Sequence, residues 1–401
     1  MEVLACGHCA TAAGARVCVH LTTEDTRDCY RVLTGVATRF DLLCEPCADA
    51  EAPELLDACV GCFERAETDA YLGWRGAPEI RRHDRDLGGT WTTWDGLEPR
   101  NDRCLAALPD GWLVWTDAGL AVLGPEPRYA AWVRLPEEPP SEWAGRVRGP
   151  ALHTSADGRF AAAVTDHGRH GAIVDLASGE VTLELDRGDY HPEQTPFPVA
   201  FVGSRVVAAT DWNRLDAFDP ATGRLLTDRD RDGDRSIDYF FGALLPSPSG
   251  RRLLADGWVW SPFGVPVVID CAAWFGGDRY APEHPRRLAQ RAYAWGDPLG
   301  WLDDETVVQQ RIGDDDEQMI DGVTRYDAVT GRRTGVFAGP AGRMWTHRGL
   351  LYVAAEAGLE VWDPADGARV GLLEGFAPIA HHDGAFAELR NDQLRIWSPV
   401  G

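Results

Sequence analysis

Residues 361–367 read Val361-Trp362-Asp363-Pro364-Ala365-Asp366-Gly367. Two apolar residues lead into an aspartate, and a polar turn then ends at a glycine, which adopts the positive φ of tight turns at little cost. The pattern recurs at Asp175, Asp219 and Asp327, each with a glycine four residues later. Each copy predicts a β-strand that ends at the aspartate, a turn, and the start of the next strand.

Strand-hairpin units of this kind recur from residue 112 to the C-terminus. Their spacing is irregular but mostly about 40–50 residues, as in four-stranded propeller blades. We count seven: Trp112–Leu123, Arg159–Asp175, Arg205–Asp219, Arg252–Asp270, Thr306–Asp327, Leu351–Asp363 and Ala385–Trp397. The expected fold is therefore mainly β: a seven-bladed β-propeller over residues 76–401, preceded by a small α+β zinc-binding module over residues 1–75. We expect blade closure near residues 85–100, with Thr90–Trp94 paired to the final blade.

After residue 85 the chain resembles the WD-repeat and quinoprotein-like propeller superfamily. Val361-Trp362-Asp363 and Ile396-Trp397-Ser398 are similar to the third-strand ending of WD repeats, although the Gly-His dipeptide of that family is missing from its usual place. The Asp-x-x-Thr-Gly turns are similar to quinoprotein-like propellers. Enzymes of that type are exported, and Met1–Cys6 shows no signal peptide, so we expect no quinone cofactor.

The cysteines are concentrated near the N-terminus, where eight of the ten lie before residue 63. Three C-x-x-C pairs and one Cys-x-His pair supply eight ligands, the number that two tetrahedral zinc ions require. The candidate ligands are Cys6, Cys9, Cys18, His20, Cys44, Cys47, Cys59 and Cys62. Cys29 and His8 are alternatives to His20. The competing interpretation is a redox-active or merely buried cysteine cluster.

Local signals predict the secondary structure of this module. We expect a strand over residues 15–21, a helix from Thr22 or Thr23 to about Leu33, a strand over residues 38–43, and a helix from Glu54 to about Ala66. A module of this size buries too small a core to fold alone, so metal would supply much of its folding energy. The zinc ions are therefore expected to be structural.

The order of the four ligand pairs resembles the cross-brace zinc modules of the RING and FYVE type. In those modules alternate pairs share an ion. The sequence departs from RING because a helix and a strand are expected between His20 and Cys44, where RING has only a few residues. The resemblance therefore implies zinc ligation, and we do not extend it to ubiquitin-ligase activity.

Composition excludes several classes of function. All 39 basic residues are arginine, which excludes enzymes that need a lysine amine, such as P-loop hydrolases, protein kinases and Schiff-base enzymes. A net charge of −24 disfavours binding to nucleic acid and to anionic membranes. An arginine group at Arg75, Arg81, Arg82 and Arg85 is the only feature that supports nucleic-acid binding through the module. We expect a cytoplasmic protein.

Three weaker motifs lie within the expected propeller. Residues 228–234 have the D-x-D-x-D-G spacing of a calcium loop. The later ligand positions of that loop hold Ser236 and Tyr239, so Asp238 would have to supply the last carboxylate ligand. The alternative interpretation is a charged surface turn. Residues 314–317 form an acidic hairpin tip. His381-His382-Asp383 is a candidate metal site in the central channel.

These observations predict an intracellular binding or adaptor protein that uses the propeller as a scaffold for a protein partner, rather than an enzyme. The alternative is a propeller hydrolase or lactonase with a metal in the central channel.

Overall fold

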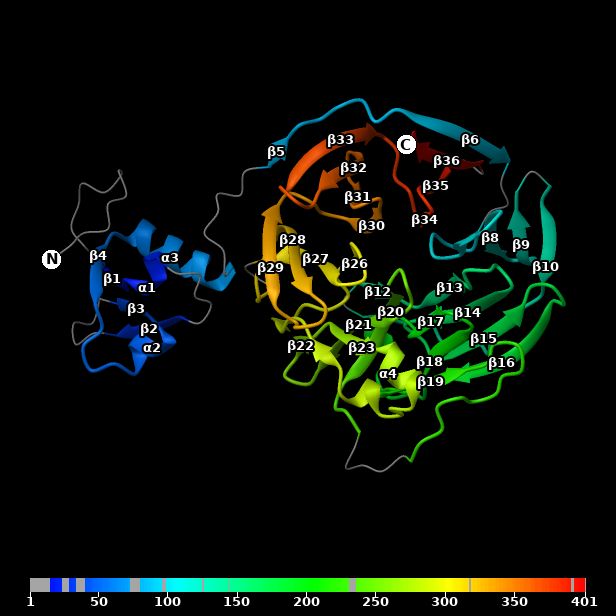
Figure 1. The fold of residues 1–401 in the computed structure, drawn as a ribbon, viewed down its shortest axis with the longest axis horizontal. Coiled ribbons are helices and arrows are strands. Elements are labelled where there is room, and N and C mark those ends of the chain that lie inside the picture. The colour runs from blue at the N-terminus through cyan, green and yellow to red at the C-terminus, as the bar shows by residue number, and fades with distance from the viewer. Residues whose placement is uncertain are drawn as a thin grey trace.

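The computed structural model describes residues 15–23, 29–33, 40–72, 80–95, 99–124, 126–143, 145–230, 236–316, 319–390 and 393–400. Its main feature is a ring of seven β-sheets, which the chain visits in sequence order (Figure 1). A separate small sheet with three helices precedes the ring. The predicted fold class, a seven-bladed β-propeller after a small α+β module, is confirmed.

The N-terminal module is built on a four-stranded sheet of order β2-β3-β1-β4. Buried apolar residues of the strands, such as Val17 and Leu42, pack against Phe63 of the third helix in one core. The elements are β1 (Ala15–Cys18), α1 (His20–Thr23), β2 (Cys29–Leu33), β3 (Phe40–Cys44), α2 (Glu45–Ala48), β4 (Leu55–Ala58) and α3 (Val60–Leu72).

Two of the expected helices are wrong in part, although the second is confirmed over residues 60–66. Residues 29–33, expected at the end of a helix, form β2, which pairs antiparallel with β3 and places Cys29 opposite Cys44. Residues 55–58, expected inside the second helix, form β4 beside β1, and α3 begins only at Val60. In both places sheet pairing overrides local helix signals. The strand expected at residues 38–43 is confirmed as β3, and β1 covers only the first part of the strand expected at residues 15–21.

Each of the seven predicted hairpins lies within one blade of the ring. The first blade contains β7 (Leu105–Leu108), β8 (Gly111–Thr116), β9 (Gly119–Leu123) and β10 (Arg128–Ala131). The second contains β13 (Gly149–Thr154), β14 (Phe160–Asp166), β15 (His170–Asp175) and β16 (Glu180–Asp186). The third contains β17 (Val199–Val202), β18 (Arg205–Asp211) and β19 (Arg214–Phe218). The hairpin β11 (Glu142–Trp143) and β12 (Arg146–Val147) lies between the first two.

The fourth blade is the largest, with six strands. It contains β20 (Phe240–Pro246), β21 (Arg252–Val259), β22 (Phe263–Gly264), β23 (Val267–Asp270), β24 (Arg286–Arg287) and β25 (Arg291–Ala292), with α4 (Cys271–Gly276) after β23. The fifth contains β26 (Leu299–Trp301), β27 (Thr306–Ile312), β28 (Ile320–Asp327) and β29 (Arg333–Ala338). The sixth contains β30 (Arg343–His347), β31 (Leu350–Ala355), β32 (Gly358–Asp363) and β33 (Ala368–Glu374), and the seventh β34 (Ala380–His382), β35 (Ala385–Arg390) and β36 (Gln393–Pro399).

The ring closes between segments about 300 residues apart. Strand β6 (Gly89–Asp95) pairs antiparallel with β36, and Thr90 lies opposite Ser398. In Figure 1 the cyan β6 lies beside the red β36. The expected closure of Thr90–Trp94 against the final blade is confirmed. Strand β5 (Arg81–Arg82) adds a parallel edge strand to the sixth blade.

The recurring aspartates hold turns. The Asp327 Oδ1 accepts hydrogen bonds from the backbone N–H groups of Val329 (2.9 Å) and Thr330 (2.7 Å), and Gly331 takes a φ of 76°. Asp175, Asp219 and Asp363 also accept from the backbone two residues later. These hydrogen bonds lower the pKa of Asp219 and Asp327 below its usual value. The motif that predicts the fold is therefore structural.

No helix in the described part of the chain has the length and apolar character needed to cross a membrane.

Candidate metal centre

Four of the predicted ligands meet at one edge of the N-terminal sheet. Strands β1 and β3 are parallel neighbours, with Val17 beside Leu42, so their carboxyl ends lie at the same edge. Cys18 is the last residue of β1 and Cys44 the last residue of β3. The chain turns into α1 at His20 and into α2 just before Cys47. Each strand end thus presents two ligands to the same point.

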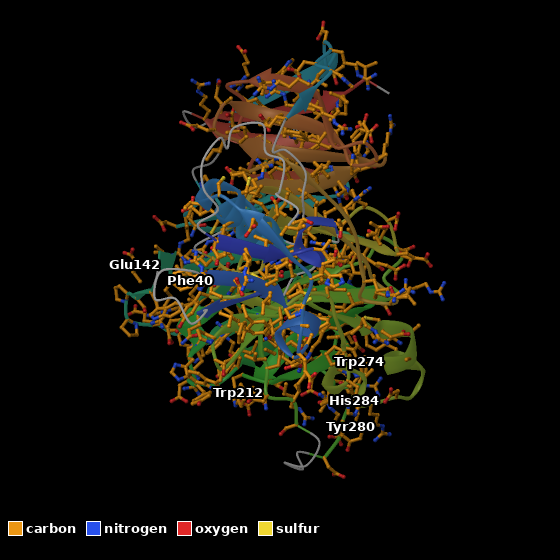
Figure 2. The ribbon with its side chains drawn as sticks, turned by 90° about the vertical axis from the view of Figure 1, so that its left-hand side faces the viewer. Phe40, Glu142, Trp212, Trp274, Tyr280 and His284 are labelled. Atoms are coloured by element: carbon orange, nitrogen blue, oxygen red, sulfur yellow. The ribbon has the colours of Figure 1, made fainter. Side chains whose placement is uncertain are left out.

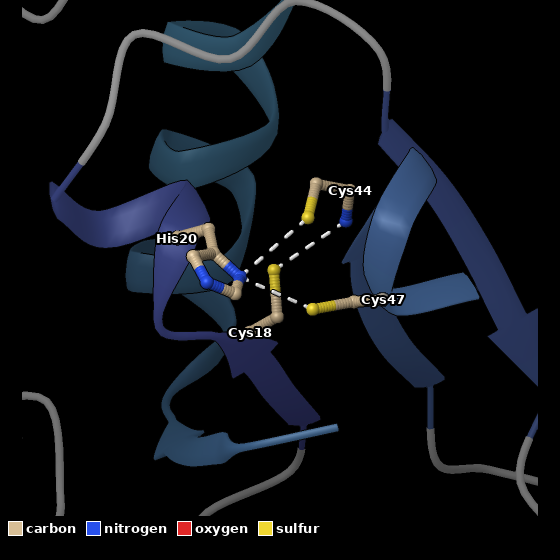
Figure 3. A group of neighbouring side chains, drawn as sticks. All are labelled: Cys18, His20, Cys44 and Cys47. Atoms are coloured by element: carbon tan, nitrogen blue, oxygen red, sulfur yellow. Dashed lines mark hydrogen bonds between the residues drawn. The ribbon is translucent and has the colours of Figure 1, made fainter. Parts of the chain in front are cut away.

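The side chains of Cys18, His20, Cys44 and Cys47 point toward one another (Figure 3). Their ligand atoms all lie within 4.8 Å of one another. The His20 Nδ1 is 3.2 Å from the Cys47 Sγ and 3.7 Å from the Cys44 Sγ. In a tetrahedral zinc site, bond lengths of about 2.0–2.3 Å separate neighbouring ligand atoms by roughly 3.5–3.8 Å. The observed spacing fits a single metal ion with little adjustment.

The environment of the thiols favours a bound cation. The three cysteines are buried and His20 is half-buried. Burial, together with the neighbouring Cys44, raises the pKa of Cys47 to about 12, and burial also raises the pKa of Cys18. Grouping several thiolates in an apolar interior is unfavourable unless a positive charge offsets them. A divalent metal supplies that charge and replaces the thiol protons.

Cys59 and Cys62, the fourth pair of predicted ligands, lie at the opposite edge of the sheet. Strand β4 runs antiparallel to β1, so Ala58 lies beside Ala15, at the start of β1, and Leu55 lies beside Cys18. Cys59 follows β4 directly, and the Cys62 N–H donates to its Sγ at 3.4 Å. The length of β1, about 10 Å, therefore separates this pair from the four-residue cluster. Cys6, Cys9 and His8 lie outside the described residues.

This arrangement differs from the cross-brace expectation. There, the Cys18/His20 pair would share an ion with the Cys59/Cys62 pair, because alternate pairs combine. Instead the second and third pairs meet, because β1 and β3 are parallel neighbours. Cys29 is not in the cluster, and among the described residues His20 completes it.

The calcium-loop candidate is only partly within the described residues. Residues 231–235 lie outside them. Tyr239, at the twelfth position, is buried, and its hydroxyl donates to the Val265 carbonyl at 2.8 Å, so it does not serve as a calcium ligand. Asp238 is exposed. The acidic tip is held in part by Arg311, which donates to Asp316 at 2.8 Å; Glu317 lies outside the described residues.

The channel candidate does not form a ligand cluster in the described part of the chain. His381 and His382 end β34, and the His381 Nε2 accepts from the Gly384 N–H at 3.1 Å. Burial, with His347 and His382 nearby, lowers the pKa of His381 to about 4, so the ring is neutral at pH 7. Of the arginine group, Arg81 and Arg82 form the edge strand β5, Arg85 is exposed, and Arg75 lies outside the described residues.

Comparison with solved structures supports the fold. The chain is similar to a chain of the "Crystal Structure of Mitotic Checkpoint Complex", with a TM-score of 0.53 and 13% sequence identity. The match covers 80% of this chain and 96% of that one. At this identity the match supports the fold alone. No protein-family model matches the sequence, and no curated protein matches it.

Proposed function

We propose that this chain is an intracellular, cytoplasmic binding protein without catalytic activity. Its propeller would act as a scaffold that holds a rigid face toward a protein partner, and structural zinc would hold its N-terminal module together. The structural-zinc part of the proposal is carried by the cluster of Cys18, His20, Cys44 and Cys47 at two converging strand ends. A shell of four protein ligands leaves no open position for water or substrate, which is typical of structural sites.

Zinc is the metal that this ligand set suits best. Thiolate and imidazole ligands in a tetrahedral arrangement favour zinc over magnesium or calcium, which prefer oxygen ligands. The three cysteines lie among the buried side chains of the module, which include Val17 and Leu42. A bound ion would therefore join β1 and β3 through the core itself and contribute folding free energy to a module of modest size.

A second zinc ion is proposed at the other edge of the sheet. Cys59 and Cys62 lie beside the start of β1, and Cys9 precedes β1 by only six residues in the sequence. The pair Cys6/Cys9 would complete this site. The pairing order would then be nested, with the first pair joined to the fourth and the second to the third, and all eight predicted ligands would be used.

The scaffold role rests on how the propeller uses its polar residues. The conspicuous aspartates hold turns between strands, and the candidate channel histidines are not grouped with other ligands in the described part of the chain. The seven sheets provide a rigid frame whose loops are free to vary, which suits binding to a partner.

The test is affinity purification of the tagged chain from its native host, followed by quantitative mass spectrometry. Three versions are compared: the full chain, residues 76–401, and the double variant Cys44→Ala/Cys47→Ala, with Cys104→Ala/Cys271→Ala as the matched control. We expect a stoichiometric partner with the full chain and its control. Loss of the partner from residues 76–401 and from Cys44→Ala/Cys47→Ala would place its contact on the module, and retention in both would place it on the propeller. Absence of any partner from every sample would contradict the scaffold role.

A further inference from the structure

A column of five stacked aromatic rings lies within the propeller, and its three central rings are buried. Phe240 stacks on Trp258, with ring centroids 4.2 Å apart and 12° between the planes. Tyr190 extends the stack beyond Phe240 at 5.7 Å. On the other side Trp295 lies 5.3 Å from Trp258, and Trp143 lies 5.9 Å from Trp295. Offset stacking of this kind fixes the rings in place.

The outer end of the column opens into an exposed aromatic face. Tyr190 and Trp260 are each 47% exposed, and they pack with the half-buried Trp212 around Phe240, which is only 3% exposed. Tyr293 is 66% exposed, and its backbone N–H donates to the carbonyl of Pro262, two residues after Trp260, at 2.9 Å. We call Tyr190, Trp212, Trp260 and Tyr293 the aromatic face.

The residues of the aromatic face lie on the same side of the ring. They occupy loops that precede first strands or follow second strands of neighbouring blades, and in antiparallel sheets these loops share one side. In Figure 2, Trp212 lies toward the side that carries Glu142, whereas Tyr280 and His284 lie toward the other. Rings from separate blades thus build one surface.

The backbone around the aromatic face is strained. His191 has a φ of 55°, Tyr293 of 54° and Ser261 of 111°. Serine and tyrosine rarely adopt such values, whereas histidine adopts them more often; residues in strained conformations are concentrated at functional sites. His191 also packs edge-on against Trp260 at 5.4 Å. These positions lie in the loops that carry Tyr190, Trp260 and Tyr293.

The charge beside the aromatic face is negative. Asp189 precedes Tyr190, Asp211 precedes Trp212, and Asp238 lies two residues before Phe240. None of these three acids forms an ion pair within the described residues, unlike many other acids of the propeller, such as Asp216, which pairs with Arg229 at 2.6 Å. Asp189 and Asp238 are exposed. The face therefore combines large rings with unneutralised carboxylates on a chain whose net charge is −24.

We propose that the aromatic face binds an arginine- or lysine-containing segment of a partner protein. Cationic side chains stack favourably on tryptophan and tyrosine, and the three carboxylates add charge complementarity. A polyanion would be repelled, and a neutral apolar segment would cover the acids without pairing them. This inference rests on the proposed scaffold role and names the surface and the chemistry of the partner.

The test uses the full chain, immobilised and screened against a display library of random 12-residue peptides. Selected peptides are then measured in solution by fluorescence polarisation. The variant Tyr190→Ala/Trp260→Ala removes two rings of the face. Its matched control, Tyr129→Ala/Trp132→Ala, removes a tyrosine and a tryptophan that are each 59% exposed on the outer part of the first blade. A second variant, Asp189→Asn/Asp238→Asn, changes exposed acids only, and thermal unfolding checks that each variant is folded.

We expect selected peptides enriched in arginine or lysine. The ring variant should weaken their binding by about tenfold or more, and the control by less than about twofold. The acid variant should weaken binding severalfold and reduce its dependence on salt. Peptides without cationic enrichment, or full affinity in the ring variant, would overturn the inference. Selected peptides that bind the ring variant fully would leave the scaffold role intact, whereas a screen without any binder, together with no co-purifying protein, would overturn both.

Discussion

A buried cysteine of the candidate metal centre and a buried cysteine of the propeller should differ in their effect on zinc binding. Cys47 lies in the ligand cluster and in the core of the module, whereas Cys271 is buried in the propeller near Trp274. Cys47→Ala should lower zinc affinity on the order of a hundredfold or more, about 3 kcal/mol, because one of four ligands is lost. Zinc content and thermal unfolding of the module report the effect.

The matched control is Cys271→Ala. It removes a buried thiol of similar exposure and should leave the zinc content unchanged, although it lowers the stability of the propeller. Equal zinc content in the two variants would show that Cys47 is not a ligand.

A buried carboxyl in the fourth blade predicts a pH effect. Burial raises the pKa of Asp256 from its usual 3.8 to about 7; Asp297 adds to this, while Arg146 and the Gly296 N–H, which donates at 2.8 Å, oppose it. The folded chain therefore binds this proton more tightly than the unfolded chain does. The associated stability is complete below about pH 4 and is lost as pH rises toward 7 and above.

Asp256→Asn should remove this dependence. Between pH 4 and pH 8 the wild type should lose up to roughly 4 kcal/mol of unfolding free energy relative to the variant. Urea unfolding at several pH values measures it. Parallel stability curves for the two proteins would mean that Asp256 titrates normally.

At the residue scale, the candidate metal ligands could be predicted from the sequence, but which side chains meet in the folded chain could not. The C-x-x-C spacing identifies candidate ligands such as Cys44 and Cys47, since both lie within one turn of chain. It does not reveal that Cys18 and Cys44 meet, because that depends on the parallel pairing of β1 and β3. The aromatic column was missed for the same reason, as its rings come from positions as distant as Trp143 and Trp295.

At the scale of elements, ring closure depends on close contact between β6 and the last blade. A Cβ atom on Gly89 would lie 2.0 Å from the Trp397 Nε1, and Trp397 is only 1% exposed. Gly89→Ala should therefore destabilise the propeller by about 1–3 kcal/mol through overpacking. Gly88→Ala is the control, because a Cβ there meets nothing within 4 Å. Chemical denaturation measures both, and an equal effect of the two substitutions would mean that the contact does not constrain closure.

Elements were predictable where their signal is local. The turn at Asp327 carries its own cap and glycine, so its hairpin could be predicted directly. The helix expected up to Leu33 failed, because residues 29–33 gain more from pairing with β3 than from local helix propensity. Strand β4 was missed inside an expected helix because its partner, β1, lies about 40 residues away in the sequence.

At the scale of the whole molecule, the propeller and the module are stabilised differently. Seven sheets bury extensive apolar surface between neighbouring blades, with Trp258, Trp362 and Trp397 almost fully buried. The module has one small core, within which the candidate metal ligands lie. Its stability should therefore depend on metal, and that of the propeller should not.

Native mass spectrometry of the freshly purified full chain tests most directly whether metal holds the module. We expect a mass that exceeds the sequence by two zinc ions. A chelator under denaturing conditions should release both ions and leave the mass of the reduced chain. A freshly purified, folded chain that carries no metal, or whose mass instead reports disulfides among the N-terminal cysteines, would contradict the proposed metal centre.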